Sequence, residues 1–122
     1  MTLQGSCHCG KTRFELSSAP TELTSCTCSL CSKRGALWAY YTPDQFRLLT
    51  PLDDVATYRW RSRIIANHFC DQCGCSTYTE SPSWVDFKPD FDHPKIGVNA
   101  RLLEGFDLDA VPVTVLDGKN LW

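Results

Sequence analysis

The sequence of 122 residues has no long hydrophobic run, no excess of basic residues and no nucleotide-binding motif. Its longest apolar stretches, around residues 35–41 and 111–116, are far shorter than the roughly 18 residues that a membrane-spanning helix requires. Twelve Lys and Arg residues against 14 Asp and Glu residues give a net charge of -2, which argues against nucleic-acid binding through a basic face. Glycine-rich phosphate loops and an H-E-x-x-H motif are also missing, which disfavours phosphoryl transfer and hydride transfer.

No secretory signal is expected, because residues 1–16 lack a basic stretch followed by an apolar one. We therefore expect a cytoplasmic protein, and in a reducing cytoplasm disulfides rarely persist. The hydrophobic fraction of 43% and the charged fraction of 21% are typical of a globular chain, and the length predicts one domain.

The unusual feature is the number of cysteines, which is eight and exceeds what a small core needs. In a reducing compartment, clustered cysteines are typical of metal ligands or redox groups. They fall into three groups with the spacings C-x-C, C-x-C-x-x-C and C-x-x-C-x-C. The members are Cys7 and Cys9, then Cys26, Cys28 and Cys31, then Cys70, Cys73 and Cys75.

The first and third groups have the form of zinc knuckles, tight turns from which two thiolates can reach one metal ion at about 2.3 Å. Gly10 and Gly74 follow these turns, and glycine permits the positive φ that folds a loop around an ion. Structural zinc takes four ligands, so two such turns predict a closed site. Its predicted ligands are Cys7, Cys9, Cys70 and Cys73.

The middle group, Cys26, Cys28 and Cys31, offers three thiolates and no obvious local fourth ligand. Three protein ligands and one open position are typical of catalytic zinc. Cys75 leaves three alternatives open: a fourth ligand that closes this site, a buried free thiol that leaves it open, or a redox sensor.

The pattern between the cysteine groups predicts a mainly β fold. Strands are expected at residues 12–16, 38–42 and 57–60, and residues 64–69 and 76–80 are expected to form a hairpin with the metal at its tip. Residues 113–116 predict a mostly buried strand, which Pro112 should begin or place at an edge. The only visible helical start is Thr42-Pro43-Asp44, for a turn or two.

Several segments together resemble one protein family, namely GSCHCGKTRFEL, SCTCSLCSKRGALWAYY, FCDQCGC, VNARLLEGFDLDAV and LDGKNLW. With them the sequence resembles, over residues 3–122, the glutathione-dependent formaldehyde-activating family, which includes centromere protein V. The resemblance implies a small single-domain β-tent with zinc-binding knuckle loops and two zinc ions. It assigns Cys7, Cys9, Cys70 and Cys73 to the structural zinc, and Cys26, Cys28 and Cys31 to the catalytic zinc.

The activity that the resemblance implies is a carbon-sulfur lyase reaction, which joins glutathione to formaldehyde as S-hydroxymethylglutathione. The expected partners are therefore a small-molecule thiol and an aldehyde. Arg101, in the segment V-N-x-R, is our candidate for binding a glutathione carboxylate, whereas Lys33 and Arg34 are interpreted as solvated loop charges. Leu102 stands where the family often has cysteine, which bears on substrate preference. The alternative is a non-catalytic binding module stabilised by two structural zinc ions.

Overall fold

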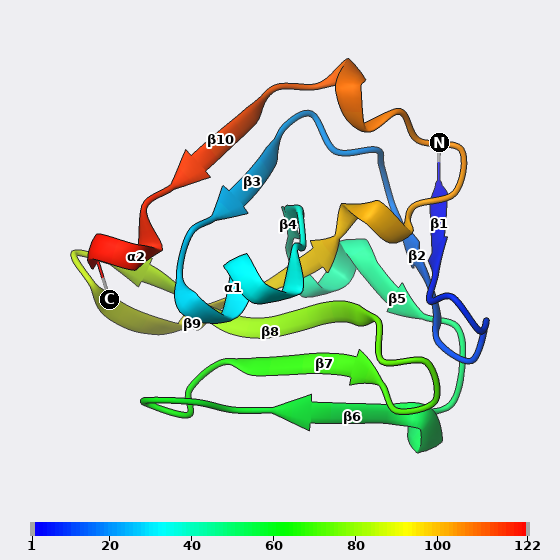
Figure 1. Ribbon diagram of the computed structural model, residues 1–122, viewed down its shortest axis with the longest axis horizontal. Coiled ribbons are helices and arrows are strands. Elements are labelled where there is room, and N and C mark those ends of the chain that lie inside the picture. The colour runs from blue at the N-terminus through cyan, green and yellow to red at the C-terminus, as the bar shows by residue number, and fades with distance from the viewer. Residues whose placement is uncertain (1, 122) are drawn as a thin grey trace.

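The structure is a computed structural model that describes residues 2–121, and it is mainly β, as predicted. The strands form two sheets (Figure 1). The smaller has the order β1-β2-β5, with β1 at Leu3–Ser6, β2 at Arg13–Leu16 and β5 at Phe46–Leu48. The larger has the order β10-β3-β4-β9-β8-β7-β6. Its strands are β3 (Leu23–Cys26), β4 (Trp38–Tyr41), β6 (Val55–Tyr58), β7 (Ala66–Cys70), β8 (Ser76–Val85), β9 (Lys88–Asn99) and β10 (Val113–Leu116).

The hydrophobic core joins the two sheets. In β2 the side chains alternate, so that Phe14 and Leu16 are fully buried while Arg13 and Glu15, which precede them, are partly exposed. Leu23, Tyr41 and Val98 and other residues of the larger sheet pack in the same cluster. This burial fixes the two sheets against each other, and with them the loops that carry the cysteines.

The predicted hairpin is confirmed, and the turn between β7 and β8 holds Cys73. The strand expected at residues 57–60 is displaced, because β6 begins at Val55 and ends at Tyr58. Strand β9, which the sequence did not predict, contains Pro89 and Pro94. Proline has no N–H to donate to a neighbouring strand, and it is tolerated here because the pairing of β8 with β9 shifts register between Pro82 and Ser83.

The prediction of a mostly buried strand at residues 113–116 is wrong in its burial. Strand β10 is present and begins directly after Pro112, but Val113 and Val115 are 45% and 65% exposed. The reason is its position at the edge of the larger sheet, where it pairs with β3 alone, in parallel (Figure 1). The inference that Pro112 marks a strand beginning or an edge is confirmed on both counts.

Short helices connect the strands. The predicted helical start at Thr42 gives one 3-10 turn, η1 (Pro43–Gln45). The sequence missed α1 (Ser29–Arg34), which follows β3 and carries Cys31, and α2 (Gly118–Leu121). The remaining 3-10 turns are η2 (Leu52–Asp54), η3 (Ala100–Leu102) and η4 (Leu108–Ala110). No helix within residues 2–121 has the length and apolar character needed to cross a membrane.

Candidate functional site

The first cluster of cysteines, which we call the tetrad, contains Cys7, Cys9, Cys70 and Cys73. All four Sγ atoms lie within 4.8 Å of one another. Two residues come from the turn between β1 and β2 and two from the end of β7 and the turn that follows, at neighbouring places at one end of the molecule (Figure 1). The tetrad therefore links the smaller sheet to the larger one.

Local backbone geometry makes both turns suitable for two ligands each. Gly10 and Gly74 have φ values of 82° and 81°, the conformation for which glycine was expected. Gly10 donates its N–H to the carbonyl of Cys7 at 3.3 Å, and Gly74 donates to that of Cys70 at 2.8 Å. The N–H of Thr12 also points at a ligand atom and donates to Cys7 Sγ at 3.3 Å. Each turn thus closes on its own first cysteine.

The sulfur spacing in the tetrad fits zinc. Cys9 Sγ lies 3.7 Å from Cys7 Sγ and 3.6 Å from Cys70 Sγ. Tetrahedral zinc with Zn–S bonds of about 2.3 Å would place its sulfur ligands about 3.8 Å apart. Burial raises the pKa of Cys73, but hydrogen bonds from the backbone of Cys75 and Cys9 outweigh it and lower that pKa to about 6. The thiolate form that a metal needs is therefore favoured at this position.

The second cluster, which we call the triad, contains Cys26, Cys28 and Cys31, whose Sγ atoms also lie within 4.8 Å of one another. Cys26 ends β3, Cys28 is the N-cap of α1 and Cys31 lies within α1. The Cys28 sulfur accepts the N–H of Cys31 at 3.4 Å, so the ligand turn and the helix cap are one structure. Among residues 2–121 no further Cys, His, Asp or Glu joins this group.

Hydrogen bonding and burial act in opposite directions on the triad thiols. Burial raises the pKa of Cys28, but hydrogen bonds, first from the N–H of Cys31, bring it below its ordinary value. Burial is the main cause of the raised pKa of Cys26 and of Cys31, and the neighbouring thiols add to it. A hydrogen bond from the buried Trp38 side chain partly counteracts this at Cys31. The three sites thus titrate together, and a divalent cation among them would compensate for their mutual repulsion.

Cys75 belongs to neither cluster and is partly exposed, so the interpretation as a buried thiol is wrong. A hydrogen bond from the His8 backbone lowers its pKa, but burial and the nearby thiols of Cys73 and Cys7 raise it overall. These neighbours are tetrad residues. The Cys75 thiol therefore lies near the tetrad but outside both clusters, and the triad has three sulfurs.

Arg101 lies beside the triad helix. Its Nε donates to the carbonyl of Gly35, the C-cap of α1, at 2.8 Å. Its backbone N–H donates to Asn99 Oδ1 at 3.2 Å. No Asp or Glu within residues 2–121 forms an ion pair with this side chain. Arg101 thus fastens the carboxyl end of α1 and keeps a solvent-exposed cationic group next to it.

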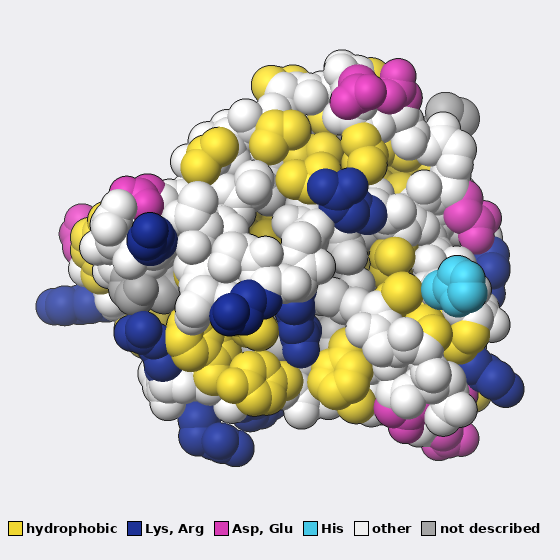
Figure 2. Space-filling model, viewed as in Figure 1, with side chains coloured by type: hydrophobic (Ala, Val, Ile, Leu, Met, Phe, Trp, Pro, Cys, Tyr) yellow, Lys and Arg dark blue, Asp and Glu magenta, His cyan; other side chains and the backbone are white. Residues whose placement is uncertain are grey.

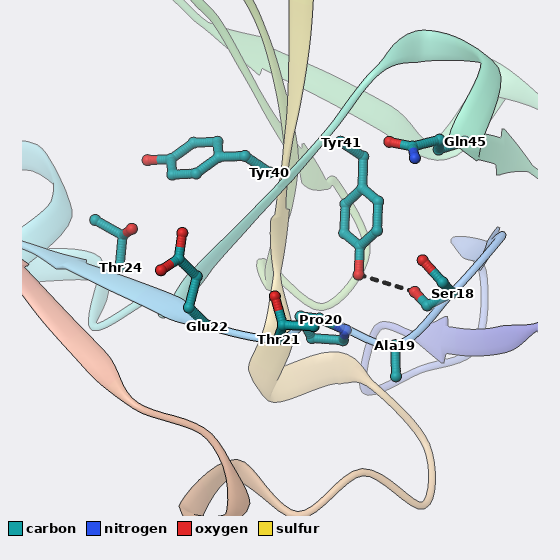
Figure 3. A pocket seen from close by; sticks show the side chains of 9 residues that line it. All are labelled: Ser18, Ala19, Pro20, Thr21, Glu22, Thr24, Tyr40, Tyr41 and Gln45. Carbon is teal, nitrogen blue, oxygen red and sulfur yellow. Dashed lines mark hydrogen bonds between the residues drawn. The ribbon is translucent and has the colours of Figure 1, made fainter.

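A groove of about 230 Å³ lies between residues 18–24, which lead from β2 into β3, and the two tyrosines of β4 (Figure 3). None of the triad cysteines lines it. Tyr41 faces Ser18 and donates its hydroxyl to that residue's carbonyl at 3.0 Å, whereas Tyr40 points to the other side, over Thr24. Burial, followed by the charges of the triad cysteines, raises the pKa of Tyr40. Both tyrosines line this groove, while Trp38 is buried against the triad instead.

A second cavity, also of about 230 Å³, was not visible in the sequence. Its lining residues are Arg34, Gly74, Cys75, Ser76 and Asn99. They come from the end of α1, the β7–β8 turn and the end of β9, and thus from elements that carry the triad and the tetrad.

Helix α1 has one signal in the sequence that could have revealed its end. Lys33 and Arg34 are basic residues directly before Gly35, which has a φ of 68° in the structure. Its N-cap is a cysteine, which no ordinary capping rule predicts.

Known proteins resemble this chain in sequence and in fold. The sequence matches the family described as "Glutathione-dependent formaldehyde-activating enzyme" over residues 2–97. It is 30% identical over 103 residues, 77% of this chain, to a Halomonas elongata protein named "Putative glutathione-dependent formaldehyde-activating enzyme", and the match spans 63% of that protein. The crystal structure of a Rhodobacter sphaeroides protein superposes with a TM-score of 0.71 and 29% identity, over 91% of this chain and 99% of that one. The chain therefore belongs to the glutathione-dependent formaldehyde-activating enzyme family.

Proposed function

We propose that this protein binds two zinc ions, a structural one in the tetrad and a catalytic one in the triad, and joins a thiol such as glutathione to an aldehyde such as formaldehyde. The observation that carries the proposal is the triad itself. Three cysteine sulfurs lie within 4.8 Å, and no fourth ligand from the described residues completes the group. The family name supplies the two substrates.

Cys26, Cys28 and Cys31 would hold the zinc ion, and the ion would supply a positive centre that favours the thiolate form of a thiol bound beside them. The three negative ligands outweigh the charge of the ion, so polarising an aldehyde oxygen is the weaker role. The addition itself forms a carbon-sulfur bond and opens the carbonyl double bond, and the oxygen takes up a proton. No oxidant or reductant is needed, which agrees with the absence of a nucleotide-binding motif.

The protein's own residues hold the three sulfurs in place. Cys28 caps the amino end of α1, Arg101 binds the carbonyl at its carboxyl end, and Trp38 reaches Cys31. The helix is only six residues long, so these contacts, rather than helix propensity, fix its position. We also propose that the terminal nitrogens of Arg101 bind a carboxylate of the thiol substrate.

The test is to measure hydroxymethyl adduct formation from ¹³C-formaldehyde by NMR, with and without glutathione, against the uncatalysed reaction. Replacing Cys31 by serine should remove about one of two zinc ions per chain and abolish the catalysed rate, with the fold retained. Ser32→Ala is the matched control, since Ser32 is exposed on the same helix and should leave rate and zinc content unchanged. A catalysed rate in Cys31→Ser equal to that of the wild type would refute the proposal.

The competing hypothesis of a binding module with two structural zinc ions predicts a different result for Cys75. If Cys75 closed the triad, Cys75→Ala would release the second zinc. Because Cys75 lies outside that group, we expect this variant to keep two zinc ions. Elemental analysis of the purified variant measures the outcome directly.

A further inference from the structure

The cavity lined by Arg34, Ser76 and Asn99 lies between elements that carry the two cysteine clusters, and no described cysteine of the triad lines it. Its volume of about 230 Å³ is below the roughly 300 to 1,000 Å³ of pockets that enclose a whole drug-sized ligand. It can therefore accept one end of a molecule whose other end lies elsewhere. One feature of its lining indicates the chemistry of that end.

This feature is an arginine without an acidic partner. The Arg34 guanidinium carbon lies 5.4 Å from the centre of the Phe69 ring and 5.9 Å from that of the Tyr58 ring. No carboxylate of residues 2–121 forms an ion pair with it. Figure 2 shows Lys and Arg side chains next to α1, directly above hydrophobic side chains that cover β6 and β7. Contact with two rings restricts the side chain, so that less conformational entropy is lost when it binds an anion.

The rest of the lining is held in place by the sheet. Ser76 pairs in register with Phe69, the residue over whose ring Arg34 lies, and its backbone carbonyl accepts Asn99 Nδ2 at 2.9 Å. The Ser76 hydroxyl is buried and bonds to no described atom, so it has no accessible surface to offer a ligand. The group with which this cavity can bind an anion is therefore Arg34.

We propose that this cavity is the subsite for the carboxylate nearer to the thiol of the substrate, which in glutathione is that of glycine. The proposal rests on the proposed function. Arg34 supplies a two-pronged, charge-assisted contact. Arg34 follows Cys31 by three residues in α1, which places the two on one side of the helix with Cβ atoms about 5 to 6 Å apart. In glutathione the glycine directly follows the cysteine, and the two residues together extend over at most about 7 Å of chain. The thiol and the glycine carboxylate can therefore reach neighbouring sites.

The earlier interpretation of Arg34 as a solvated loop charge is thereby replaced. Arg34 lies in a helix and is only partly exposed, whereas Lys33 beside it is exposed and does not line the cavity. The two residues share charge and location but differ in their contacts. They form a matched pair for testing whether the cavity, rather than general positive charge, binds the carboxylate.

The experiment measures the binding of S-methylglutathione to the zinc-loaded protein by calorimetry. This probe keeps both carboxylates, and its blocked sulfur cannot become a thiolate. Arg34→Gln should weaken binding about tenfold or more, the effect of losing hydrogen bonds to a charged group. Lys33→Gln should leave the affinity unchanged.

A second probe carries an ethyl ester on the glycine carboxylate of S-methylglutathione. The wild type should bind the ester about as weakly as Arg34→Gln binds the free acid, and Arg34→Gln should not distinguish acid from ester. The proposal would be overturned if Arg34→Gln bound the acid as tightly as the wild type does. It would also be overturned if the variant lost equal affinity, relative to the wild type, for the acid and for the ester, or if the wild type did not bind the acid at millimolar concentration.

These outcomes separate the subsite from the proposed reaction. If Arg34→Gln behaves as expected while zinc-loaded wild type forms no hydroxymethyl adduct, the subsite stands and the lyase function fails. If the adduct forms but Arg34→Gln binds S-methylglutathione as tightly as wild type, the lyase function stands and the subsite fails.

Discussion

The tetrad and the triad should contribute differently to stability because they close loops of different length. The tetrad connects Cys9 to Cys70, which are 61 residues apart, whereas the triad lies within residues 26–31. Treated as cross-links, loops of these sizes would reduce the entropy of the unfolded chain by the equivalent of about 4 and about 2 kcal/mol. Removing the tetrad zinc should therefore cost about twice as much free energy of unfolding as removing the triad zinc.

The comparison uses two double variants, Cys7→Ser with Cys9→Ser and Cys26→Ser with Cys28→Ser, each of which removes two ligands of one cluster. Cys9 is exposed, whereas Cys26 and Cys28 are both buried, so any direct packing cost falls more heavily on the triad variant. With a slope of about 2 kcal/mol per M, the urea midpoint should fall by about 2 M for the tetrad variant and about 1 M for the triad variant.

Unfolding can be followed by the fluorescence of the four tryptophans and by circular dichroism, with zinc counted in the same samples. Each variant should contain one zinc ion per chain. A triad variant that is destabilised as much as the tetrad variant, with one zinc ion lost in each case, would refute the reasoning from loop length.

Two further predictions concern the core. A Cβ atom at Gly5 would lie 2.3 Å from Cζ of the fully buried Phe14, so Gly5→Ala should lower the free energy of unfolding by about 1 to 3 kcal/mol through overpacking, and an unchanged melting temperature would contradict this. Burial raises the pKa of Tyr41 to about 12, above the value of about 10 in the unfolded chain. The contribution of this shift to stability is complete below pH 10 and is lost as the pH rises toward 12. Urea titrations of Tyr41→Phe should therefore show a smaller fall of the free energy of unfolding between pH 10 and pH 12. An equally steep fall in the variant would count against this.

Much of the site was predictable because its ligands are close in sequence. Cys7 and Cys9 are held on one turn by covalent geometry, and Gly10 has the positive φ that its place in the motif predicts. The strands at residues 38–42 and 64–69 were recognisable because aromatic and apolar residues cluster there. Helix α1 was not recognisable, since its cap is a cysteine and its position depends on contacts with Arg101 and Trp38.

The sequence by itself determined the mainly β class, the turns that present cysteines in pairs and the grouping of three sulfurs in one segment, because all of these depend on neighbouring residues. The tertiary structure decided what depends on sheet register and packing. It brought Cys9 to Cys70 across 61 residues, turned Cys75 toward the tetrad and exposed β10 at a sheet edge. It also placed Arg34 and Ser76 at one cavity, an arrangement that arises only when Arg34 at the end of α1 lies over Phe69 of β7.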